Sequence, residues 1–121
     1  MRHLTGSVTA LMLLLSLTLS GGTTANAFLS ASDLLAQCES PEAADRDSCR
    51  FFVLAVSDTM NVFVDSAPRK RLRRFYCLPI NSVTDYQLTE IVVEGLNQEP
   101  TLHLGAASLI INLLRDAYPC D

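Results

Sequence analysis

Residues 84–100, TDYQLTEIVVEGLNQEP, decide the fold of this chain. The first four residues match a capping box, in which the Thr84 oxygen accepts from the Gln87 amide and the glutamine side chain reaches back to the threonine amide. Pro100 ends the segment, because its ring clashes inside a continuing helix. The sequence therefore predicts a helix from Thr84 to just before Pro100. Its buried stripe consists of Leu88, Ile91, Val92, Gly95 and Leu96.

Residues 101–118, TLHLGAASLIINLLRDAY, predict a further helix, which Thr101 caps and Pro119 stops. Gly105 falls inside its first turns, where we interpret it as the mark of a close helix contact. Two adjacent apolar rows cover this segment: Leu102, Ala106, Leu109 and Leu113, and beside them Ala107, Ile110, Leu114 and Tyr118. Such a wide apolar face is typical of a central bundle helix or of one that also contacts a second subunit. We therefore predict a homodimer.

Two more helices precede these. Capping residues at 30–33 predict a short first helix that runs to about Cys38, and acidic residues predict a second from about Asp47 to Val64. The apolar stripe of the second helix is Phe52, Val56, Met60 and Phe63. The predicted fold class is all-α, a compact bundle of about four helices with short connections and two disulfides.

The N-terminal 27 residues have the pattern of a signal peptide. A positively charged start is followed by a short apolar run, Leu11 to Leu19, and by the small-x-small site Ala25-Asn26-Ala27. That run is well short of the ~20 residues of a membrane-spanning helix, so an uncleaved anchor is the weaker alternative. Cleavage between Ala27 and Phe28 would leave residues 28–121 as a single exported domain without stable membrane insertion.

Length and charge exclude several function classes. Residues 28–121 are too few for a two-layer α/β domain with its own cofactor pocket, and we predict no cofactor. Without Arg2 the chain carries thirteen acidic and eight basic residues, a net charge of −5. That balance argues against binding to nucleic acid, which requires a basic footprint.

The four cysteines, Cys38, Cys49, Cys77 and Cys120, predict two disulfides rather than a metal site, because no C-x-x-C pair occurs. Cys38 and Cys49 flank the turn between the first two helices. Cys77 precedes the third helix and Cys120 follows the fourth, and a short connection makes these helices antiparallel. Both cysteines then lie at one end of that hairpin. The predicted pairs are Cys38–Cys49 and Cys77–Cys120.

No catalytic motif is present, and we predict that the protein is not an enzyme. His103 is the only histidine after residue 27, and no nucleophile or orienting partner marks it as a base. Glu90 and Glu94, at i and i+4, could bind a cation or a partner, but a solvated helix face explains them better. Neither catalytic residues nor metal ligands are predicted.

Residues 69–74, RKRLRR, form the strongest charge feature. The basic side chains are Arg69, Lys70, Arg71, Arg73 and Arg74. They are candidate residues for binding an acidic partner. A mobile, solvated loop is the alternative, because blocks of like charge commonly stay flexible.

The chain also resembles a known family. The resemblance rests on CLP at 77–79, LTEIVVEGL at 88–96, AASL at 106–109 and AYPC at 117–120, with Pro100, His103, Cys38 and the helix after Cys49. This pattern is similar to the Rap/Tai-like immunity proteins of type VI secretion systems. The resemblance implies a small, helical, disulfide-bonded periplasmic protein, often dimeric, that binds a cell-wall amidase toxin and occludes its active site.

The predicted function is thus a periplasmic immunity protein whose partner is an amidase effector. Such a task requires rigid display of an inhibitory surface and no catalytic residues. The alternative is a small periplasmic chaperone of the acid-stress kind, which exposes apolar surface when its carboxylates become protonated. No motif distinguishes the two, but the acidic content alone is a weaker indication than the family pattern.

Overall fold

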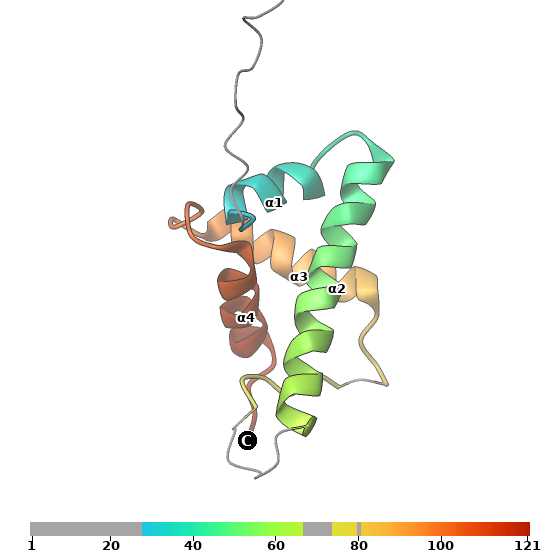
Figure 1. The fold of residues 1–121 in the computed structure, drawn as a ribbon, viewed down its shortest axis with the longest axis vertical. Coiled ribbons are helices and arrows are strands. Elements are labelled where there is room, and N and C mark those ends of the chain that lie inside the picture. Colours follow the sequence, from blue (N-terminus) through green and yellow to red (C-terminus); the bar gives the residue numbers. More distant parts are fainter. Residues whose placement is uncertain (1–27, 67–73, 80) are drawn as a thin grey trace, which may run out of the picture.

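The chain folds into four helices, α1 (Ala31–Cys38), α2 (Ala43–Ser66), α3 (Asp85–Gln98) and α4 (Ala106–Ala117) (Figure 1). The computed structural model describes residues 28–66, 74–79 and 81–121, without the side chains of residues 63–66. The expected leader, residues 1–27, and the basic residues Arg69, Lys70, Arg71 and Arg73 lie outside the described residues. For the described part, the prediction of an all-α fold with four helices is confirmed.

Side-chain caps set the starts of α1 and α3. Ser30 Oγ accepts a hydrogen bond from the amide of Asp33 at 3.2 Å. At α3 the capping box is complete: Thr84 Oγ1 accepts from the amide of Gln87 at 3.2 Å, and Gln87 Oε1 accepts from the amide of Thr84 at 2.9 Å. These bonds satisfy amides that have no partner within the helix, so both starts agree with the sequence prediction.

Helix α2 begins at Ala43, earlier than the expected start near Asp47. The hydroxyl of Ser40 accepts from the amide of Glu42 at 3.2 Å and donates to Asp45 at 2.7 Å. Asp45 lies in the first turn, where a negative charge stabilises the free amides. The turn after α1 therefore supplies the contacts that stabilise the first turn of α2, and α2 begins directly after it.

The buried face of α2 also differs from the expected one. Its innermost side chains are Cys49, Val53 and Ser57, and the Ser57 hydroxyl is satisfied because it donates to the Val53 carbonyl at 3.0 Å. The expected stripe lies one residue to the side: Phe52, Val56 and Met60 are half-buried against the core, and the Phe63 side chain is outside the described atoms. The buried row includes the polar Ser57, so apolar spacing alone does not predict it.

Helix α4 begins at Ala106, and the expected start at Thr101 is wrong. The chain turns before it, and the carbonyls of Leu102 and Leu104 accept the free amides at the start of α1, at 2.9 Å each. Because these carbonyls accept hydrogen bonds from the first amides of α1, they are not used in the hydrogen bonds of a helix that starts at Thr101. Gly105 is the N-cap, and a Cβ there would meet no atom within 4 Å, so it marks no close helix contact.

Helices α2 and α4 lie side by side, and α3 crosses behind them (Figure 1). The expectation of an antiparallel pair of α3 and α4 is therefore wrong. Every helix contacts the other three around one core. Its largest fully buried side chains are Leu34, Val53, Val92, Leu96, Ile110 and Leu114. Burial of apolar side chains in this shared core therefore holds the four helices together.

Both predicted disulfides are present. Cys38 is bonded to Cys49 and Cys77 to Cys120, with Cα–Cα distances of 5.1 and 5.0 Å. The second pair forms for a reason other than the expected hairpin. The amide of Cys77 donates to the carbonyl of Tyr118 at 2.9 Å, so residues 74–79 lie along the end of α4 and bring the cysteines together.

Candidate functional site

An open cleft of about 660 Å³ lies between the first turns of α2 and the length of α3. Its walls are formed by Arg46, Asp47 and Arg50 of α2 and by Tyr86, Glu90 and Glu94 of α3, and its floor includes the Cys38–Cys49 disulfide. We call it the α2–α3 cleft. The Cys38–Cys49 disulfide joins the start of α2 to the end of α1, and α3 crosses behind α2 (Figure 1).

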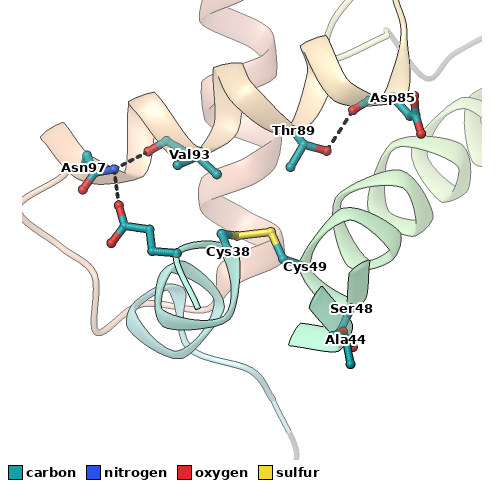
Figure 2. The surroundings of a disulfide bond; sticks show 9 residues. Cys38, Ala44, Ser48, Cys49, Asp85, Thr89, Val93 and Asn97 are labelled. Atoms are coloured by element: carbon teal, nitrogen blue, oxygen red, sulfur yellow. Dashed lines mark hydrogen bonds between the residues drawn. A yellow bond between two sulfur atoms is a disulfide. The ribbon is translucent and has the colours of Figure 1, made fainter. Parts of the chain in front are cut away.

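One face of α3 is directed toward the disulfide (Figure 2). Asp85, Thr89, Val93 and Asn97 follow each other at helical spacing along this face, and Thr89 Oγ1 donates to the Asp85 carbonyl at 2.8 Å. At the far end, the Asn97 side chain donates to the Val93 carbonyl at 3.1 Å and to Glu39 at 2.8 Å. The bond to Glu39 ties α3 to the end of α1.

Arg50 connects the two walls of the cleft. Its guanidinium lies 2.9 Å from Asp47 on α2 and 3.7 Å from Asp85 at the start of α3. The same group lies over two rings, 4.9 Å from the Tyr86 centroid and 5.6 Å from that of Phe51. Such cation–π contacts favour a planar guanidinium. Arg50 is therefore held in one place by two carboxylates and two aromatic rings.

The cleft offers side chains for noncovalent contacts. Its lining residues include neither a histidine nor a free thiol. Within the described residues, no cluster of three or more His, Cys, Asp or Glu side chains is arranged to hold a metal ion. His103 is exposed in the turn before α4 and does not line the cleft. The arrangement offers aromatic, charged and apolar side chains to a partner surface.

A second hollow, about 260 Å³ in volume, lies between α2 and α4, and we call it the α2–α4 groove. It is lined by Phe52, Ala55, Val56, Thr59, Met60, Ala107 and Ile111. This groove accounts for the half-buried row of α2. Most of the wide apolar face of α4 is used in the core, and Ala107 and Ile111 are left at its edge.

Sequence reasoning did not identify this site. Glu90 and Glu94 were interpreted as a solvated helix face, and the structure places both on one wall of the α2–α3 cleft. Arg50, Phe51 and Tyr86 were missed, because nothing local in the sequence pairs the start of α2 with that of α3. Of the basic candidates, only Arg74 is described; it is exposed next to Phe75 and does not line the cleft.

Four packed helices, two disulfides and an open cleft lined by charged and aromatic side chains define a small helical, disulfide-bonded domain. Comparison with family models matches residues 30–120 to the Rap1a immunity proteins. The chain belongs to this family, and the resemblance seen in the sequence is confirmed. The match extends from the cap of α1 to Cys120, so it includes both disulfides and the cleft.

The family makes this an immunity protein against a secreted toxin, a class that is generally non-enzymatic. Comparison with curated proteins gives no match. Among the described residues, no helix has the length and apolar character needed to cross a membrane.

Proposed function

We propose that this protein binds and blocks a peptidoglycan amidase toxin that a type VI secretion system delivers into the periplasm. The observation that carries the proposal is the family match over residues 30–120. The two disulfides support a periplasmic location, because such bonds form and persist in oxidising compartments. A leader at residues 1–27, cleaved between Ala27 and Phe28, would deliver the domain there.

The proposed mechanism is occlusion by a rigid surface. The disulfides and the packed helices fix the backbone before the toxin arrives, so little conformational entropy is lost on binding. No residue of the immunity protein has to react. Inhibition then depends on how much of the toxin's active-site groove is covered, and it is stoichiometric.

The test uses the purified protein without residues 1–27 and the amidase encoded beside its gene. We expect a stable complex and loss of peptidoglycan hydrolysis at one equivalent of inhibitor. Production of the amidase in the periplasm of a sensitive strain should be lethal, and co-production of the full-length protein should protect. A purified pair that forms no complex, or an amidase that stays active in the complex, would contradict the proposal.

We also propose that the basic residues Arg69, Lys70, Arg71, Arg73 and Arg74 contribute to partner binding. Their shared charge would attract an acidic region of the toxin and increase the association rate. Replacing the five residues with glutamine should slow association and weaken its salt dependence, measured by stopped-flow mixing at two ionic strengths. An unchanged association rate would mean that the segment is a solvated loop that does not contribute to binding.

A homodimer is a further part of the proposal, and the α2–α4 groove is its candidate interface. The groove is lined by largely apolar side chains from two helices, and contact with a second copy would remove this surface from water. Sedimentation at micromolar concentration should show a dimer, and Ile111→Asp should give a monomer that is still folded. If the wild-type protein is a monomer at this concentration, the homodimer proposal is wrong and the proposed toxin binding is unaffected.

A further inference from the structure

Two exposed aromatic rings lie close to Arg50, and one of them, Tyr86, lines the α2–α3 cleft. The relative exposure of Tyr86 is 68% and that of Phe51 is 63%, although both rings lie within cation–π distance of the same guanidinium. Tyrosine and arginine are the side chains most often responsible for binding energy in protein interfaces. Large rings that are held in place but left open to solvent indicate a contact surface.

The positive charge of Arg50 is already neutralised. Asp47 lies 2.9 Å from it and Asp85 lies 3.7 Å from it. The other arginine of the cleft, Arg46, donates to the carbonyls of Ser40 and Pro41 at 2.8 and 2.6 Å. Arg50 is thus paired with carboxylates on both α2 and α3, and Arg46 is bonded to backbone carbonyls of the turn before α2, so both cations already have partners within the protein.

The opposite wall has uncompensated negative charge. Glu90 and Glu94 lie one helical turn apart on α3, both are exposed, and neither forms an ion pair with a described residue. Two like charges at this spacing destabilise a helix slightly, and a cation placed between them removes that cost. The charge complementarity of the cleft therefore favours a positively charged group at the α3 wall.

Between the two walls, the floor is apolar and rigid. Val93 and the Cys38–Cys49 disulfide form it, and Cys49 is only 1% exposed. An apolar floor beside two carboxylates matches a lysine or arginine side chain, whose hydrocarbon stem packs on apolar surface while its charged end reaches the carboxylates. A free small cation would use the carboxylates but not the floor or the rings.

We infer that the α2–α3 cleft is the toxin-binding surface, and that Glu90 and Glu94 receive a lysine or arginine side chain of the toxin while Tyr86 packs beside it. The inference rests on the proposed function and specifies the surface that performs it. Arg50 acts as a positioning residue, because it holds the Tyr86 ring at the mouth of the cleft. Of the basic segment at residues 69–74, the described residue Arg74 does not line the cleft.

The experiment measures the dissociation constant of the adjacent-gene amidase, inactivated at its nucleophile, for wild type and variants. Glu90→Gln with Glu94→Gln should weaken binding by about tenfold or more, because the toxin cation is left buried without its partners. Tyr86→Ala should weaken it by about thirtyfold, and Tyr86→Phe should retain most of the affinity because the ring remains. The matched control is Asp58→Asn with Asp116→Asn, which removes the same charge from two exposed sites outside the cleft and should leave affinity unchanged.

A charge swap identifies the contact directly. Glu90→Lys with Glu94→Lys should abolish binding, and replacing one lysine or arginine of the toxin with glutamate should restore it. If wild type binds and the cleft variants bind equally well, the inference is overturned and the proposed function stands. If wild type itself does not bind, both fail together.

Discussion

At Gly95, α3 comes close enough to α4 that an added Cβ would overlap the Leu113 side chain unless that side chain shifts. A Cβ built there would lie 2.9 Å from Cδ1 and 3.1 Å from Cγ of Leu113. We expect Gly95→Ala to lower the free energy of unfolding by about 1 kcal/mol, because overpacking outweighs the better helix propensity of alanine. The measurement is urea unfolding followed by circular dichroism.

The control for this prediction is a second background. In Leu113→Ala protein the obstructing atoms are gone, so Gly95→Ala should stabilise by up to ~1 kcal/mol through helix propensity alone. The double-mutant cycle then measures the coupling free energy between Gly95 and Leu113, because Gly95→Ala is expected to have opposite effects in the two backgrounds. Equal effects of Gly95→Ala in both backgrounds would mean that Leu113 simply moves aside.

Because of Tyr76, the free energy of unfolding depends on pH in the alkaline range. Its side chain is 3% exposed, and its hydroxyl donates to the carbonyl of Ser57 at 3.3 Å. Burial raises the pKa of Tyr76 above its ordinary value of 10.0; the side-chain hydroxyl of Ser57 lowers it, and Asp58 adds a smaller increase. The folded protein therefore retains the Tyr76 proton at pH values at which the unfolded chain has lost it.

The sign follows from this difference in proton binding. The stabilisation is complete below pH 10 and is lost as the pH rises from about 10 through the folded-state pKa. We expect the free energy of unfolding of wild type to fall more steeply between pH 9 and pH 11 than that of Tyr76→Phe. Denaturant unfolding at these two pH values measures the slopes, and parallel slopes would exclude Tyr76 as the cause.

Among the elements, α3 depends most on its first turn. Thr84→Ala removes one half of the capping box and should cost about 1 kcal/mol of unfolding free energy. Thr84→Ser retains the hydroxyl and should cost much less. Ser82→Ala, two residues earlier and exposed, is the matched control and should have little effect. The measurement is thermal unfolding, and a loss from Ser82→Ala as large as that from Thr84→Ala would argue against the cap.

The elements also show which features local sequence can specify. The starts of α1 and α3 were predicted correctly because their caps involve residues three apart in the chain. The start of α4 was not, because the carbonyls of Leu102 and Leu104 bond to the first amides of α1, far away in sequence. The face of α2 was misplaced by one residue, because its buried row includes the polar Ser57, whose hydroxyl is satisfied by the Val53 carbonyl and which an apolar pattern overlooks.

For the whole molecule, the fold class and cysteine pairing followed from the sequence, but the site did not. Glu90 and Glu94 look like a solvated helix face until α2 is placed opposite them. The pairing of Cys77 with Cys120 was right although the hairpin behind it was wrong, because residues 74–79 lie along the end of α4 instead. Packing between distant segments creates the cleft, and no spacing rule in one segment contains that information.

The two disulfides should have separable effects on stability and on binding. Cys77 and Cys120 are both exposed and close a loop with a sequence separation of 43, whereas the Cys38–Cys49 bond spans 11 and forms the floor of the cleft. Loop entropy predicts losses of about 4 and about 3 kcal/mol, respectively, when each is removed. We expect Cys77→Ala with Cys120→Ala to be the less stable variant.

Binding should follow the opposite order. Measured at low temperature, where circular dichroism confirms that both variants are folded, Cys38→Ala with Cys49→Ala should lose affinity for the inactivated amidase, because the start of α2 is no longer held opposite α3. Cys77→Ala with Cys120→Ala should bind as wild type does, because that bond lies outside the cleft. Stability would then be governed by the longer loop and recognition by the shorter one. If both variants lost affinity in proportion to their stability, the disulfides would act on the molecule as a whole and the cleft would have no special dependence on its floor.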